Sequence, residues 1–146
     1  MKPGHVAVLS AAAAATLTLS CGLAAAEPQP ALTRNAAIAR AYIDALVSHD
    51  ASAVPFAPDA TRVEAGIQTG YSGPQLSNDL EHGVQYSVIQ RVHDLHLSED
   101  GEVVSTRYLL DSGVGGVRLV TVDITETFVI RDGLIRSIVA TIVPVG

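Results

Sequence analysis

Three side chains in this sequence have types and positions suited to acid–base chemistry: Tyr42, Glu64 and Glu126. A carboxylate can remove a proton beside a carbonyl group, while a tyrosine and a neutral carboxylic acid can donate hydrogen bonds to the developing oxyanion. The three residues are therefore candidates for an enolisation site. The alternative is a buried tyrosine bonded to a buried glutamate, in a core or a ligand pocket without chemistry.

Tyr42 lies in a segment whose apolar residues recur at helical spacing. Ile38, Tyr42 and Leu46 fall on one side of a helix that we predict from about residue 35. Tyr42 is thus expected to point into the core. We interpret His49-Asp50 as the end of this helix rather than as a catalytic dyad.

Glu126 lies in the middle of a long predicted strand, residues 117–130. Side chains alternate between the faces of a strand, so Glu126 shares its face with Val120, Val122, Ile124, Phe128 and Ile130. The opposite face carries Thr121, Thr125, Thr127 and a solvated Asp123. Because a buried charge is costly unless it is paired or protonated, we expect Glu126 to be neutral near pH 7.

The segment His93-Asp94-Leu95-His96 contains residue types that bind metals. On a regular strand His93 and His96 face opposite sides, so we predict no metal site there. Leu95 and Leu97 share the odd-numbered face with His93. We therefore expect His93 to line the pocket.

Residues 1–26 have the layout of a secretory signal peptide. Lys2 gives a positive start, an Ala-rich apolar run follows, and residues 24–26 offer small side chains for cleavage. Alternatively, residues 18–21 resemble a lipoprotein box, in which a signal of residues 1–20 is removed and Cys21 is lipidated. A membrane-spanning helix fits less well because the run is only weakly hydrophobic. We expect a secreted protein or a cell-envelope lipoprotein.

The composition after residue 26 excludes several functions. Eight arginines and fifteen acidic residues remain, a net charge of −7, which disfavours nucleic acids and anionic membranes. The one lysine and the one cysteine both precede residue 27, so Schiff-base chemistry, thiol catalysis and an internal disulfide are excluded. With no glycine-rich phosphate loop or Gly-x-Ser-x-Gly motif, we expect no cofactor.

The remaining chain predicts a linker at residues 27–33 and one α+β domain at residues 34–146. The first helix is followed by a turn at residues 50–54, a strand at 60–64, a loop at 65–74 and a short helix at 74–83. Four strands then follow at 88–97, 102–110, 117–130 and 134–143. Their short connections predict an antiparallel meander.

The run A-Y-I-D-A-L-V-S-H-D, followed by P-F-A-P-D-A-T-R-V-E and a curved antiparallel sheet, resembles the nuclear transport factor 2-like superfamily over residues 34–143. This superfamily includes ketosteroid isomerases and SnoaL-like polyketide cyclases. The same run also resembles an uncharacterised group of exported SnoaL-like proteins. The resemblance implies helices packed in a curved sheet around a conical pocket.

Against the ketosteroid isomerases, Tyr42 matches the tyrosine of the first helix and Glu64 matches the base. Glu126, two residues before Phe128, matches the protonated acid of the oxyanion hole. Both acids are Glu where those enzymes use Asp, and Ala65-Gly66 replaces their usual Asp-Pro step.

We expect a pocket for a small apolar molecule, with a cofactor-independent isomerase, cyclase or dehydratase as the alternative. The residues expected to line it, besides the three candidates, are Ile38, Leu46, Phe56, His93, Val122, Ile124 and Phe128. The threonine-rich face is a candidate homodimer interface, by analogy with relatives.

Overall fold

The computed structural model describes residues 30–146, of which residues 31–146 form one compact unit. The signal peptide predicted at residues 1–26 and the lipidation alternative at Cys21 lie outside the described residues. Within residues 30–146, no helix is both long and apolar enough to cross a membrane.

Helix α1 (Arg34–Ser48) packs its apolar side against the sheet and ends where the sequence predicts. The side chain of Thr33 accepts a hydrogen bond from the backbone N–H of Ala36 at 3.2 Å, which caps the start. His49 ends the helix in the left-handed conformation at φ 56°. Tyr42 is almost completely buried, as its helical spacing predicts, and so is the neighbouring Ile43.

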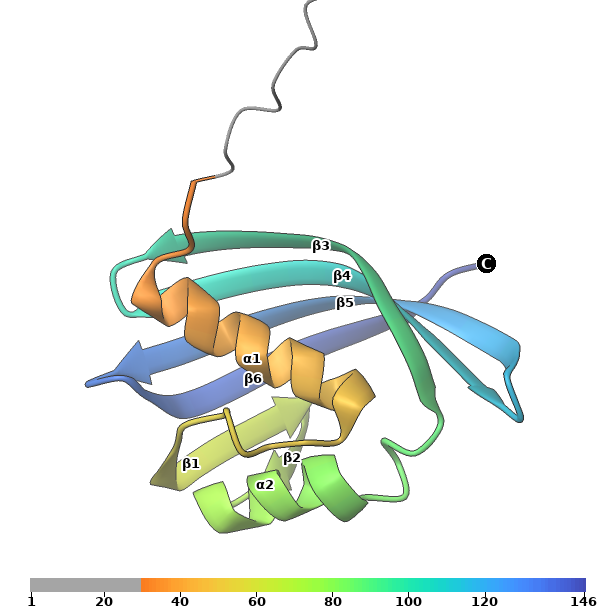
Figure 1. Ribbon diagram of the computed structural model, residues 1–146, viewed down its shortest axis with the longest axis horizontal. Coiled ribbons are helices and arrows are strands. Elements are labelled where there is room, and N and C mark those ends of the chain that lie inside the picture. The colour runs from red at the N-terminus through yellow and green to blue at the C-terminus, as the bar shows by residue number, and fades with distance from the viewer. Residues whose placement is uncertain (1–29) are drawn as a thin grey trace, which may run out of the picture. The chain divides into compact units, whose positions relative to one another are not determined.

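The six strands form one curved sheet in the order β2-β1-β6-β5-β4-β3. The predicted antiparallel meander is confirmed in its last four strands, β3 (Ile89–Asp100), β4 (Val103–Val114), β5 (Val117–Arg131) and β6 (Leu134–Pro144). Strand β1 (Phe56–Glu64) joins this meander by pairing parallel with β6. Figure 1 shows α1 lying across the inner side of the curved sheet, which places the first helix opposite the middle strands.

The prediction of a loop at residues 65–74 is wrong for its first half, which contains a strand. Strand β2 (Ile67–Gly70) folds back on β1 as an antiparallel hairpin. Ala65 and Gly66 form the two-residue turn with φ of 49° and 81°, the positive values that favour a tight hairpin. The reversal therefore follows directly after Glu64 and fixes this residue at the end of β1.

Helix α2 (Gly73–His82) covers β1, and its ends match the prediction. Ser72 accepts a hydrogen bond from the backbone N–H of Gln75 at 3.2 Å, Pro74 lies in the first turn, and Gly83 follows the last. Leu76 and Leu80 are fully buried beneath it. Helix α2 thus anchors the edge of the sheet that carries Glu64.

The prediction that His93 lines the pocket is wrong, because β3 contains a bulge. Asp94 takes φ 54°, and the pairing of β3 with β4 shifts between His93 and His96. His93 pairs with Leu109 and His96 with Arg107, two residues apart on β4, so both histidines lie on the outer face of the sheet. The prediction that His93 and His96 face opposite sides of the sheet is also wrong, because it assumed a regular strand without this bulge. Among residues 30–146, no three His, Cys, Asp or Glu side chains are grouped to hold a metal ion.

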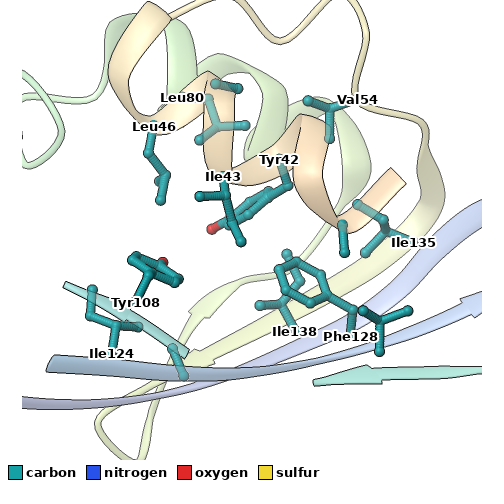
Figure 2. Close-up of a cluster of buried hydrophobic side chains, with 14 of the residues drawn as sticks. Tyr42, Ile43, Leu46, Val54, Leu80, Tyr108, Ile124, Phe128, Ile135 and Ile138 are labelled. Carbon is teal, nitrogen blue, oxygen red and sulfur yellow. The ribbon is translucent and has the colours of Figure 1, made fainter. Parts of the chain in front are cut away.

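The core fills the space between α1 and the inner face of the sheet. Figure 2 shows Tyr42 and Ile43 from α1 facing Phe128, Ile138 and their neighbours. The Tyr42 ring meets Phe128 edge-on at 5.3 Å between ring centroids and Phe56 at 6.1 Å. These aromatic contacts close one end of the space under the helix.

Candidate functional site

A cavity of about 320 Å³ lies between α1, the turn after α2 and the inner face of the sheet. Its apolar lining is contributed by Leu46, Ile89, Leu110, Val122, Ile124, Ala140 and Ile142. Its polar lining comprises Tyr42, Glu64, Gln85, Tyr86, Tyr108, Ser112 and Glu126. Seven apolar and seven polar residues thus line the cavity, and most of its wall area is apolar, as is usual for small-molecule sites.

The sheet register places both glutamates in one row across three strands. Glu64 on β1 pairs with Ala140 on β6, and Ala140 pairs with Glu126 on β5. Two strand spacings separate the Cα atoms of the glutamates by roughly 10 Å. Because Ala140 is small, the floor between the two carboxyl groups stays open to the cavity.

Glu126 is enclosed by protein, with 3% of its surface exposed. Tyr108 donates a hydrogen bond to its Oε2 atom at 2.8 Å. Burial raises the pKa of Glu126 to about 7, and the charge of Glu64 acts in the same direction, against the effects of Tyr108 and Arg62. Near neutral pH a large fraction of Glu126 is therefore uncharged, which agrees with the expectation for an acid in an apolar row.

Glu64 is surrounded by donors at the end of β1. Its Oε2 accepts from Thr69 at 2.7 Å and lies 3.4 Å from Nε of Arg62, while its Oε1 accepts from Tyr86 at 3.2 Å. Its side chain is 22% exposed, so solvent reaches it. Glu64 is thus a carboxylate that accepts two hydrogen bonds and is paired with Arg62. It lies at the more solvent-exposed end of the row that it forms with Ala140 and Glu126.

Arg62 is a buried cation directly behind Glu64, with 1% of its surface exposed. It donates to Asp79 at 3.1 Å and to Thr69 at 3.0 Å, and its guanidinium lies 5.3 Å from the centre of the Tyr86 ring. Burial lowers the pKa of Arg62, but its neighbours Tyr42, Tyr86 and Glu64 outweigh this effect and raise it overall. Arg62 therefore stays charged and connects α2 to the site.

The hydroxyl groups of Tyr42 and Tyr108 remain protonated. Burial raises the pKa of both groups well above the ordinary value, and the charge of Glu126 raises it further. Figure 2 shows the Tyr42 and Tyr108 rings reaching toward each other from α1 and from the sheet. Tyr42 can therefore act as a hydrogen-bond donor in the cavity, whereas Tyr108 donates its proton to Glu126.

The structure brings Tyr42, Glu64 and Glu126 together on the cavity wall, with Leu46, Val122 and Ile124 beside them. It does not place Ile38, Phe56, His93 or Phe128 there. Phe56 and Phe128 pack against the Tyr42 ring, and Ile38 packs against the same core. These three apolar residues support the site from outside the cavity.

Sequence reasoning missed Arg62, Tyr86 and Tyr108. Alternation along the strands could have found two of them, since Arg62 lies two residues before Glu64 and Tyr108 shares a face with Val104 and Leu110. No local pattern marks Tyr86, which reaches the cavity from the turn between α2 and β3.

A family model described as a domain of unknown function, DUF8021, matches residues 31–142. The chain belongs to this family. No curated protein matches it in sequence.

Several solved structures, one of them described as NTF2-like, share the fold of this DUF8021 domain. An LEH-like epoxide hydrolase from M. tuberculosis matches with a TM-score of 0.64 at 19% identity, over 75% of this chain and 82% of that one. A putative polyketide cyclase from Xanthomonas campestris matches with a TM-score of 0.60 at 17% identity, over 74% and 89%. A putative ketosteroid isomerase from Kribbella flavida DSM 17836 matches with a TM-score of 0.58 at 16% identity, over 75% and 77%. At these identities the likeness shows the fold alone.

Proposed function

We propose that this DUF8021 domain binds a small, largely apolar molecule in the cavity beneath α1. The observation that carries the proposal is the cavity of about 320 Å³, whose apolar walls surround a few buried polar groups. Ala140 keeps the floor open between Glu64 and Glu126.

The test is to fill the cavity at Ala140. Ala140→Leu adds apolar volume to the floor and should abolish binding of an apolar probe such as 2-decalone, measured by calorimetry. Val139→Leu is the matched control, because Val139 is the neighbouring residue on β6 and is 50% exposed. Equal binding by wild type and Ala140→Leu would overturn the proposal. Circular dichroism and Ala140→Val, a smaller filling, separate lost binding from lost folding.

A second candidate is cofactor-independent proton transfer, as an isomerase, cyclase or dehydratase. It is favoured by two carboxyl groups of different character facing one cavity: the pKa of Glu126 is raised to about 7, and Glu64 is paired with Arg62. Glu64 is the proposed base. Tyr42 and neutral Glu126 are the proposed donors to the oxyanion.

Proton abstraction can be measured without knowing the natural substrate. In deuterated water, the enzyme should accelerate hydrogen exchange at the carbon beside the carbonyl of 2-decalone, followed by NMR. Glu64→Gln should abolish this while leaving binding nearly intact, Tyr42→Phe should lose on the order of 10²–10³ in rate, and Glu126→Gln should keep part of it. Exchange by Glu64→Gln as fast as by wild type would eliminate the mechanism and leave the binding function.

We also propose that the mature protein works outside the cytoplasm, from the leader-like composition of residues 1–26. Intact-mass measurement separates the two forms: a chain starting at Glu27 indicates free secretion, and a lipid mass on Cys21 indicates a lipoprotein. A cytoplasmic chain that retains Met1 would refute both.

A further inference from the structure

The inner face of the sheet continues past the cavity onto the hairpin that joins β4 to β5. Ser112 lines the cavity, and it also lines a neighbouring groove of about 210 Å³. This groove lies between Val88 and the hairpin, and its other lining residues are Gly113, Val114, Leu119 and Val120. Figure 1 shows the hairpin projecting beyond the rest of the sheet. The cavity and the groove are therefore neighbours on one face and share Ser112.

A bulge in β5 gives the groove its apolar wall. Val120 pairs with Ser112 and Arg118 pairs with Gly113, so Leu119 is an extra residue opposite this step of β4. Leu119 and Val120, although consecutive, consequently both line the groove. On a regular strand they would alternate between the two faces. The bulge thus adds a large apolar side chain to the wall.

The apolar side chains around the groove are exposed to solvent. Leu119 is 72% exposed and Val114 is 65% exposed, and Val88 and Val120 are exposed to a smaller extent. Exposed apolar residues that are scattered singly over a surface need no explanation. Four of them around one hollow, next to a cavity, indicate a binding surface.

The residues that line the groove are uncharged, although the protein is acidic. Residues 84–90, 112–122 and 142–146 meet at this end of the sheet, and their one charged side chain is Arg118. Arg118 donates to Thr121 at 2.9 Å and lies 3.9 Å from Asp111, on the outer face. Because a charged group in the groove would find no partner, the groove suits an uncharged hydrocarbon.

We propose that the cavity takes elongated ligands, which have a compact head and an uncharged alkyl chain, and that this chain passes Ser112 and lies in the groove. This inference rests on the proposed binding function. The shared lining residue favours this occupant, since a chain that leaves the cavity enters the groove directly. Four side chains cannot supply the roughly 1,000 Å² that a stable protein interface buries. A flat bilayer surface would not fill a hollow.

The proposal predicts how the length of the alkyl chain affects affinity. A fully buried methylene group strengthens binding by roughly fourfold. The groove is open on one side, so we expect about twofold for each methylene group that lies in it. Lengthening a chain from methyl to pentyl should therefore strengthen binding by about tenfold.

The experiment compares cyclohexanones that carry a methyl, propyl or pentyl group at carbon 4, by calorimetry. Wild type should bind the pentyl compound about tenfold more tightly than the methyl compound. Leu119→Asn removes apolar wall from the groove, so it should reduce this gain to about threefold or less and leave the affinity for the methyl compound unchanged. Leu119→Met keeps the wall apolar and should keep the gain.

Val139→Asn is the matched control, because Val139 is half exposed on the outer face of the sheet and should not affect the gain. Methyl NMR locates the chain independently of affinity. The methyl groups of Leu119 and Val88 should shift with the pentyl compound and stay in place with the methyl compound.

The outcomes separate this inference from the function on which it rests. If no cyclohexanone binds to wild type, the binding function fails and this inference fails with it. If the methyl compound binds but the pentyl group adds no affinity, or Leu119→Asn keeps the full gain, the cavity binds ligands and the groove does not hold the chain.

Two further results would assign the groove to another occupant and overturn the proposal. One is a dimer in light scattering that Leu119→Asn dissociates, which would mean that a second copy covers the groove. The other is binding to phosphatidylcholine vesicles that Leu119→Asn abolishes, which would mean that a lipid surface covers it.

Discussion

At the scale of single residues, Glu126 is the most unusual side chain of the site. It is an acid enclosed by protein, and in place of a cation it has a tyrosine donor on one oxygen. Buried acids of this kind are costly in the charged form. Its protonation state should therefore affect the stability of the fold.

The stability of the protein should depend on the protonation of Glu126. Burial raises its pKa from 4.5 to about 7, so between these pH values the folded state holds a proton that the unfolded chain releases. The free energy of unfolding should consequently fall by on the order of 3 kcal/mol as the pH rises from about 4.5 to about 7. Urea unfolding of wild type and Glu126→Gln across this range measures the effect. The same slope in both proteins would contradict the assignment.

Tyr108 should tune this acid. Its hydrogen bond lowers the pKa of Glu126, so Tyr108→Phe should raise that pKa further above 7. An NMR titration of the glutamate carboxyl carbons gives the midpoint directly. Tyr71→Phe is the matched control because Tyr71 is 65% exposed and bonds to the backbone of Gln68. A midpoint that stays the same or falls in Tyr108→Phe would show that the bond has no such role.

The positions of Tyr42, Glu64 and Glu126 on one cavity could be predicted from periodicity and resemblance. Helical spacing placed Tyr42 in the core, and alternation placed Glu126 on the inner face. The donor to Glu126 could not be predicted, because Tyr108 lies on another strand and the register between β4 and β5 is set by tertiary packing.

At the scale of elements, α2 and β1 are held together by the buried Arg62. Its hydrogen bond to Asp79 joins the two elements at 3.1 Å, and its Nε atom donates to Thr69 and forms an ion pair with Glu64. This arrangement fixes the end of β1 that presents Glu64 to the cavity. Without the Asp79 charge, the buried Arg62 would keep only the longer ion pair with Glu64, at 3.4 Å, as charge compensation.

Asp79→Asn should therefore destabilise the protein by about 2 kcal/mol or more, measured by urea unfolding. Asp44→Asn is the matched control, because the Arg40–Asp44 pair has the same chemistry on α1 but is about half exposed. That change should cost less than about 0.5 kcal/mol. Equal effects of the two substitutions would mean that the buried position of Arg62 has no energetic consequence.

The elements themselves could largely be predicted, and the errors have local causes. Both helices and the four-strand meander follow from caps, spacing and short turns. The hairpin at Ala65-Gly66 was missed because a glycine after a strand was interpreted as a loop. The bulge at Asp94 was missed because strict alternation was assumed through His93.

At the scale of the whole molecule, the nuclear transport factor 2-like fold explains why a small chain can hold an open cavity. The sheet curves around α1, and aromatic packing at Phe56 and Phe128 closes one end of the space. The resemblance carried this prediction, since the order of the predicted helices and strands indicates only an α+β domain. Neither the resemblance nor the predicted elements identify a ligand, because one fold supports many functions.

We also propose, for the molecule as a whole, that two chains form a homodimer through the outer face of the sheet. Thr125 is exposed there, with Thr121 and Thr127 partly exposed beside it. Light scattering at high concentration should give twice the mass of one chain, and Thr125→Glu should reduce it to one. A monomeric wild type at that concentration would remove the proposal.

The central claim is that the cavity beneath α1 is the ligand site, and methyl NMR with 2-decalone at pH 6 tests it most directly. The account predicts saturable shifts of the methyl groups of Leu46, Ile89, Ile124 and Ile142, which line the cavity. Leu119, which is 72% exposed on β5, should not shift. Shifts confined to Leu119 and other exposed methyl groups, or no saturable shift at any concentration, would contradict it.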